Sequence, residues 1–411
     1  MLMVVAVATA LALTGCSDDD GSGAAPASTD PQASVASSAA SAPASSTASS
    51  TATSATASTG TAAPATLVAN ELDGMPPVLD LTNVYAGAGE DDLSAAAAEA
   101  LHYVYVPTNR AGTVTVIDQA TFEIIDVYQV GDLVQHVVPD WDFGVLYATA
   151  SSSNHLVPFD PRTGLPGEGF RIDAPYNLYF TPDGARGVVV AERRNRIDYY
   201  DRTTWELVGS VDTPCDGPNH ADWSLNGQFF VVTCEFSGQM LRMDTTSGEI
   251  LDVLDLEPGS KPQDVRLVGD GSRFYIADLA AGGVRVLDAD SFTITGHIPT
   301  GGGPHSVYPS RDGRLAFIAN RSEGSVSVVD IATDTAVDKW PIPGGGSPDM
   351  GGVTLDGSQL WLSGRSHDEV YVFDTTTGEL LARIPIPGEP HGLAVMPQPG
   401  RYSLGHTGNT R

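Results

Sequence analysis

The chain has 411 residues, a formal net charge of −30 and a hydrophobic content of 41%. The acidic balance and the lack of a basic patch argue against nucleic-acid binding and against polybasic contact with anionic lipid. A chain of this length usually forms two or three domains, unless a closed repeat fold uses most of it as one.

The N-terminus is similar to the signal segment of a bacterial lipoprotein. The apolar run over residues 4–14 is too short to span a bilayer as a mature helix. It ends in Leu13-Thr14-Gly15-Cys16, which resembles a lipobox, where such precursors are cut before the cysteine that becomes lipidated. No Lys or Arg precedes the run, which departs from the usual signal. We expect residues 1–16 to be the signal segment, Cys16 the lipid carrier, and the protein to be anchored on the outer face of the cytoplasmic membrane.

Two segments with different composition follow. Residues 17–66 consist mostly of Ser, Ala, Thr, Gly and Pro and contain no aromatic residue. Such a segment cannot bury enough surface to offset its ordering entropy, so we predict a disordered tether at the cell surface. Residues 67–100 include a helical-looking stretch, DDLSAAAAEAL, and are expected to be an N-terminal extension packed on the following domain.

From residue 101 onward one block of about 42 residues recurs seven times, a period typical of propeller blades. In the first register an aspartate closes an apolar run, at Asp118, Asp160, Asp201, Asp244, Asp288, Asp330 and Asp374. The second register is formed by His136, Asn177, His220, Asp264, His305, Asp349 and His391. Short β-branched and aromatic runs separated by Asp-Gly or Asn-Gly turns predict four antiparallel strands per block. The aspartates are expected to bond turn amides within their own blades.

The first block lacks its innermost strand, and the missing strand stands at the other end of the chain. Residues 102–130 supply three strands, whereas PHGLAVMPQPG near the C-terminus copies the opening of a blade. The predicted fold of residues 101–411 is therefore an all-β, seven-bladed propeller of four-stranded antiparallel blades, closed by the C-terminal strand. Closure removes two open sheet edges that would favour aggregation.

The second register predicts a ring around the channel mouth, because each member opens an innermost strand. Imidazole is the commonest transition-metal ligand, and carboxylates complete or orient such sites. The candidate metal ligands are His136, His220, Asp264, His305, Asp349 and His391. Candidate ligand-binding residues at the same face, most of them from the ends of the second strands, are Asn177, Glu192, Glu235, Asp278, Arg321 and Arg365. The alternative is a polar channel mouth that binds nothing. The remaining histidines, His406 among them, follow neither register and are expected to have no special role.

Cys215 and Cys234 form the second candidate pair. Outside the cytoplasm two cysteines usually form a disulfide, and this one would hold the loop that carries His220. Two thiolate metal ligands beside His220 are the alternative, which suits a reducing compartment better.

The repeats resemble the YVTN-type, or YncE-like, seven-bladed propellers over about residues 100–400. The resemblance rests on YVYVPTNRAGTVTVID, FYIADLAAGGVRVLD and AFIANRSEGSVSVVD. It implies the fold, whereas relatives of this shape include lactonases, oxidoreductases, copper enzymes and binding scaffolds, so it does not choose a function.

Three functions remain open. The first is a surface lipoprotein that binds a metal ion, copper or zinc, or a small ligand at the channel mouth. The second is a metal-dependent oxidoreductase or lactonase-like enzyme at that mouth. The third is a protein-interaction scaffold that uses the propeller rim. The chain contains no C-x-x-C-H for covalent haem and no phosphate-binding loop for a nucleotide.

Overall fold

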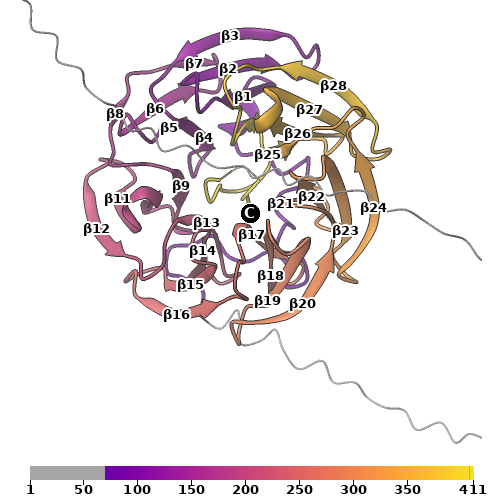
Figure 1. The fold of residues 1–411 in the computed structure, drawn as a ribbon. Coiled ribbons are helices and arrows are strands. Elements are labelled where there is room, and N and C mark those ends of the chain that lie inside the picture. The colour runs from indigo at the N-terminus through magenta and orange to yellow at the C-terminus, as the bar shows by residue number, and fades with distance from the viewer. Residues whose placement is uncertain (1–69, 407) are drawn as a thin grey trace, which may run out of the picture. The chain divides into compact units, whose positions relative to one another are not determined.

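The computed structural model describes residues 70–406 and 408–411. Seven small sheets stand around a central axis in chain order, as the blades of a propeller (Figure 1). The predicted all-β, seven-bladed fold is confirmed. The predicted signal segment (1–16), the tether (17–66) and the first residues of the predicted extension lie outside the described residues.

The strands of the first three blades are β1 (Tyr103–Pro107), β2 (Thr113–Asp118), β3 (Ile124–Gln129) and β29 (Ala394–Met396); β4 (Val134–Pro139), β5 (Leu146–Ala150), β6 (His155–Asp160), β7 (Leu165–Pro166) and β8 (Phe170–Arg171); and β9 (Asn177–Phe180), β10 (Arg186–Ala191), β11 (Arg196–Asp201) and β12 (Leu207–Asp212). Blades four and five contain β13 (Pro218–Trp223), β14 (Phe229–Cys234), β15 (Gln239–Asp244) and β16 (Ile250–Asp255); and β17 (Pro262–Val268), β18 (Arg273–Asp278), β19 (Gly283–Asp288) and β20 (Thr293–Pro299). Blades six and seven contain β21 (Pro304–Pro309), β22 (Leu315–Asn320), β23 (Ser325–Asp330) and β24 (Thr335–Pro341); and β25 (Pro348–Val353), β26 (Gln359–Gly364), β27 (Glu369–Asp374) and β28 (Leu380–Pro385). Three 3-10 turns complete the described elements: η1 (Ala97–Glu99), η2 (Glu192–Arg194) and η3 (Arg365–His367).

The ring closes as the incomplete first block predicts. Strand β29 pairs antiparallel with β1, with Met396 opposite Tyr103 and Ala394 opposite Tyr105. The pairing creates a hydrophobic core between the last blade and the first, where Val395 and Trp361 are fully buried. The other cores likewise lie between neighbouring blades, so each blade depends on both neighbours for its burial.

The strand-ending aspartates act within their own blades. Oδ1 of Asp118 accepts bonds from the amides of Ala120 and Thr121, at 2.9 Å each. Asp201 accepts bonds in the same way from the amides two and three residues ahead. The first register is therefore explained by turn chemistry.

The N-terminal end of the described chain meets the propeller on the face opposite the ring residues. Residues 70–100 run along the Asp-Gly turns, where the Leu72 amide donates to the Asn226 carbonyl and the Val84 amide donates to that of Gly269. Helix formation there is limited to η1, so the helical-looking stretch is shorter than its composition indicates. Beyond β29 the chain folds back toward the axis, and the C-terminus lies at the centre of the ring (Figure 1).

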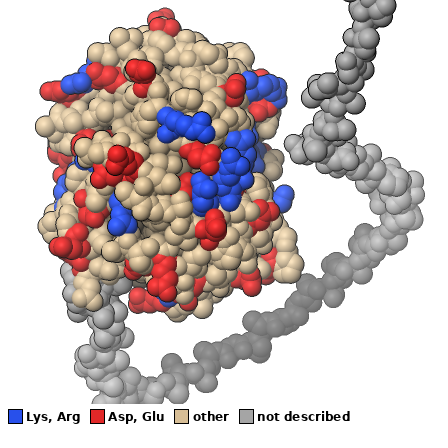
Figure 2. All heavy atoms as spheres, turned by 90° about the vertical axis from the view of Figure 1, so that its left-hand side faces the viewer, with Lys and Arg blue, Asp and Glu red and all other residues tan. Residues whose placement is uncertain are grey.

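Charged side chains of both signs lie on the outer surface of the propeller (Figure 2). Acidic and basic side chains lie interspersed on the side seen in Figure 2. Ion pairs join some such residues, and Arg196, for example, pairs with Asp173. Across residues 70–406 and 408–411 we find no helix with the length and apolar content that a membrane crossing requires.

Candidate metal centre

Bulges in the innermost strands direct the ring residues toward the axis. The pairing register shifts between Val134 and Val137 and again between Pro218 and Ala221, so His136 and His220 each lie in a bulge. A bulge leaves an amide without a ladder partner and re-aims the side chain. In both strands a threonine hydroxyl accepts a hydrogen bond from the freed backbone amide at 3.0 Å. Thr149 does so for His136 and Thr233 for His220.

The four histidines of the second register form one cluster. The ring centroid of His136 lies 4.9 Å from that of His391 and 5.6 Å from that of His220. His305 lies 6.5 Å from His220 and 6.2 Å from His391 by the same measure. Histidines associated with blades one, two, four and six therefore meet around the axis.

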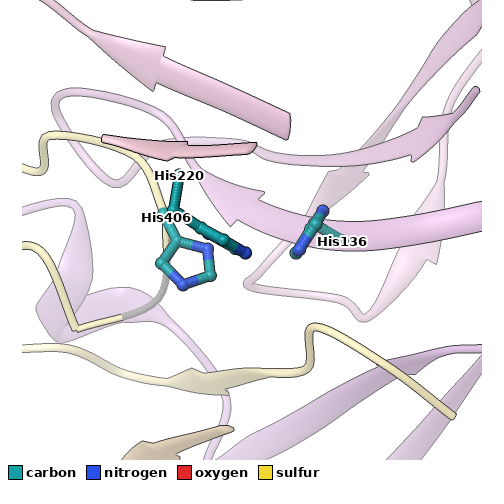
Figure 3. Close-up of side chains that lie close together, drawn as sticks. All are labelled: His136, His220 and His406. Carbon is teal, nitrogen blue, oxygen red and sulfur yellow. The ribbon is translucent and has the colours of Figure 1, made fainter. Parts of the chain in front are cut away.

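A fifth histidine joins them from the C-terminal segment. The His406 ring lies 4.7 Å from that of His220 and 5.4 Å from that of His136 (Figure 3). Sequence reasoning missed this residue because it stands outside both registers. The available signal was the alternation of Tyr402 and Leu404 beyond the closing strand, which is typical of a buried extended segment.

The cluster lies inside the protein rather than at an open, wet mouth, which corrects the expectation from the repeats. The exposure of the five histidines and Asp349 is 0–1%. The C-terminal segment fills the channel on one side, where Gly405 pairs with Tyr179 of β9. On the other side the Tyr176 ring packs 5.1 Å from His136. The repeat pattern could not reveal this burial, because both covering groups lie outside the second register.

Hydrogen bonds hold the rings by their Nδ1 atoms. Nδ1 of His136 lies 2.8 Å from the Tyr176 carbonyl oxygen, and Nδ1 of His391 lies 3.1 Å from that of Gln135. Such bonds give Nδ1 the proton and leave Nε2 as a free lone pair, the arrangement found in histidine metal ligands. Nδ1 of His220 lies 3.1 Å from the side-chain nitrogen of Asn177.

The Nε2 atoms are buried without partners. Among the described residues, no hydrogen-bonding partner reaches Nε2 of His136, His220, His391 or His406. The nearest carboxylate oxygen to Nε2 of His391 belongs to Asp349, at 3.7 Å. A buried polar atom left unpaired destabilises the folded state by about 1–3 kcal/mol. Four such atoms together would therefore destabilise the protein unless something binds them.

Burial keeps the imidazoles neutral. It lowers the pKa of His136 to about 4 and holds the pKa values of His220, His391 and His406 well below the ordinary value. Neutral imidazole is the form that binds metals.

Asp349 and Asp264 have different surroundings. Asp349 lies in the cluster, with Oδ1 2.7 Å from Nδ1 of His305 and 3.4 Å from the Arg321 guanidinium. Burial opposes its ionisation, but His305 and Arg321 outweigh burial and hold the pKa of Asp349 well below its usual range. Asp264 instead accepts hydrogen bonds from Arg266 of its own strand at 3.3 Å and from the Val307 amide of the next blade at 3.0 Å.

Two groups of side chains could hold a metal ion. His136, His220 and His406 form the first, and His305, Asp349 and His391 the second, with ligand atoms in each group within 4.8 Å of one another. Ligands of one zinc ion at about 2.0–2.1 Å lie roughly 3–4 Å apart, so small side-chain rotations would suffice. The described channel residues could therefore hold a transition metal.

Some of the candidate ligand-binding residues contact the histidine cluster, and others do not. Asn177 contacts the cluster, and Arg321 contacts Asp349. Arg365 lies 2.9 Å from the side-chain amide of Asn109. Asp278 is instead engaged by the guanidinium of Arg285 at 2.8 Å, a contact between neighbouring strands of one blade.

Glu192 and Glu235 form a pair on the ring face. The side-chain amide of Asn219 donates to Glu235 at 2.9 Å and lies 3.4 Å from Glu192. Burial, with the negative charge of Glu235 second, raises the pKa of Glu192 to about 8. A carboxyl group that holds its proton near neutral pH is suited to proton transfer.

Cys215 and Cys234 form a disulfide with their Cα atoms 6.0 Å apart. The bond joins the loop before β13 to the end of β14 across a sequence separation of 19 residues. Both cysteines are buried, at 4% and 0% exposure. The disulfide thus connects the two ends of the segment that contains His220.

The model of the YncE-like β-propeller family matches residues 80–401. This chain belongs to that family. Among curated proteins, none matches the chain.

Solved structures that resemble this YncE-like chain share its fold at low sequence identity. A functionally unknown protein from Desulfotomaculum acetoxidans is 17% identical, with a TM-score of 0.62, and the match covers 72% of this chain and 99% of that one. Kuenenia stuttgartiensis hydrazine synthase is 18% identical, with a TM-score of 0.57 and coverage of 66% and 94%. The β-propeller domain of Cps50 (Swd1) from Myceliophteria thermophila is 14% identical, with a TM-score of 0.55 and coverage of 65% and 90%. These likenesses concern the fold alone.

Proposed function

We propose that this YncE-like chain is an exported, lipid-anchored propeller that binds a transition metal in its closed channel. The observation that carries the proposal is the set of buried, unpartnered Nε2 atoms on His136, His220, His391 and His406. The export and anchoring depend on the lipobox-like sequence before Cys16.

An inert polar channel would account less well for these residues. Evolution of a stable core removes unsatisfied polar atoms or supplies partners, because each one destabilises the folded state. Here the Nδ1 atoms of His136 and His391 have partners, whereas their Nε2 atoms have none. A bound cation would satisfy the Nε2 lone pair that the Nδ1 hydrogen bond leaves free on His136 or on His391. Copper and zinc are the metals that imidazole ligands favour.

An enzymatic function at the same centre is the second candidate. It is favoured by Glu192, whose raised pKa of about 8 provides a proton donor on the ring face of the channel. A metal-dependent oxidoreductase or hydrolase would need such a donor, and a metal carrier would not.

Metal content separates these functions from that of a scaffold. Mature protein is loaded with copper or zinc, dialysed and measured by elemental analysis. We expect retained metal in the wild type and less metal per chain in the double variant His136→Ala, His220→Ala. The matched control is His155→Ala, His297→Ala, which changes two exposed histidines and should retain the metal. A wild-type protein that retains no metal would overturn the proposal.

A panel of thiol, amine and lactone substrates then tests turnover by the loaded protein. Activity that the Glu192→Gln variant loses while keeping its metal would favour the enzyme over the carrier.

A further inference from the structure

The histidine cluster offers more ligands than one ion can use. Zinc and copper commonly take four ligands, whereas five imidazoles and the Asp349 carboxylate meet here. The six divide into two triads that have no residue in common: His136, His220 and His406, and His305, Asp349 and His391. The triads are adjacent, because the rings of His136 and His391 lie 4.9 Å apart across the boundary.

The triads differ in charge. The first consists of three neutral imidazoles, and the second includes a carboxylate that Arg321 partly balances at 3.4 Å. Uncharged nitrogen ligands suit copper, whereas two imidazoles and one carboxylate are a set that zinc and other divalent metals accept. Each triad leaves a fourth position for water or a small ligand, as catalytic sites do.

The triads also differ in how the fold builds them. His305 and Asp349 come from inner strands and His391 lies just before the closing strand, so the propeller supplies the second triad alone. The first triad needs His406 from the C-terminal segment. That segment is held by the buried pair of Arg411 and Asp222 at 2.9 Å and by the Asn409 amide, which donates to the Ala221 carbonyl.

We propose that the channel holds two metal ions side by side, one on His136, His220 and His406 and one on His305, Asp349 and His391. This inference rests on the proposed function, because it concerns the same cluster. It adds that the centre is dinuclear and that the C-terminal segment supplies a ligand to only one of the ions. Adjacent ions, each with an open position, are suited to a small ligand that bridges both.

Metal stoichiometry tests the inference on the mature protein loaded with Cu(II) or Zn(II). We expect about two ions per chain in the wild type and about one in each of His406→Gln and Asp349→Asn. The control His155→Ala should keep two. Far-UV circular dichroism and the melting temperature of each apo-protein show that the variants are folded.

Electron paramagnetic resonance of the Cu(II)-loaded proteins provides a second readout. Two adjacent Cu(II) ions give a spin-coupled spectrum, and each single-site variant should give an uncoupled mononuclear one. If the wild type binds one ion that either variant loses, the dinuclear inference fails while the proposed function stands. If His406→Gln keeps both ions, the assignment of the first triad fails. If the wild type binds no metal, both fail.

Discussion

His220 and His406 pack their imidazole rings 4.7 Å apart, although one belongs to an inner strand of blade four and the other to the C-terminal segment. The contact joins two kinds of segment that surround the channel, since His220 belongs to the repeat and His406 does not. Asn177 lies against both rings, with its side-chain nitrogen 3.1 Å from Nδ1 of His220 and 3.4 Å from that of His406. The candidate metal centre therefore depends on how the chain ends as well as on its repeats.

Two deletions should distinguish the effect of ring closure by β29 from the effect of the C-terminal segment that fills the channel. Deletion of residues 388–411 removes the partner of β1 and uncovers Trp361 in the adjoining core. We expect this variant to associate through the freed strand edges and to melt more than about 10 °C below the wild type. Light scattering after size exclusion and a thermal melt measure both effects.

The matched control for closure is deletion of residues 399–411, which keeps β29 and removes only the segment inside the channel. It should be destabilised, because Asp222 loses Arg411, but it should not gain association. Equal association of the two deletions would contradict the role of β29.

The disulfide should stabilise blade four. Replacing both Cys215 and Cys234 with alanine should lower the free energy of unfolding by about 3 kcal/mol, as expected when a loop of about this length is no longer closed. Denaturant unfolding measures the change. A reductant should lower the stability of the wild type and leave the double variant unaffected. Alkylation without reductant followed by mass spectrometry should label neither thiol of the wild type, and labelling of both would contradict the bond.

Glu192 should make stability depend on pH. Its pKa is raised from 4.5 to about 8 in the folded protein, so the folded state binds more protons than the unfolded state between these values. Stability from this group is present at low pH and is lost as the pH rises toward 8. Glu192→Gln cannot ionise, so its stability relative to the wild type should be higher at pH 8.5 than at pH 5, by roughly 4 kcal/mol.

Denaturant unfolding at the two pH values measures the effect of Glu192→Gln. The exposed Glu206→Gln variant is the control and should show no difference that depends on pH. An equal shift at both pH values in Glu192→Gln would argue against titration of this carboxyl group.

The predicted lipoprotein signal at the N-terminus can be tested independently of the propeller. Cys16→Ser should release the protein from membranes into the soluble fraction, because the lipid carrier is lost and the propeller itself is expected to stay folded. Membrane fractionation followed by immunoblotting measures this. Restoring the cysteine should return the protein to the membrane fraction, and a Cys16→Ser variant that stays with membranes would refute the lipobox.

The sequence by itself determined the propeller, its blade number, its closure and the disulfide. These features depend on local chemistry repeated along the chain: Asp-Gly turns, short β-branched strands, and a missing strand whose counterpart stands near His391. The sequence also predicted four of the histidines that meet in the channel, because residues at one position of a repeat lie at one level around an axis.

Only the tertiary structure decided what those residues become. The ion pair of Asp264 with Arg266 and the burial of the whole cluster leave no periodic trace in the sequence. His406 enters through a segment that has no counterpart in the other blades. A repeat predicts the contacts that every blade makes, whereas a single segment folded into the channel is placed by long-range packing, which no local pattern encodes.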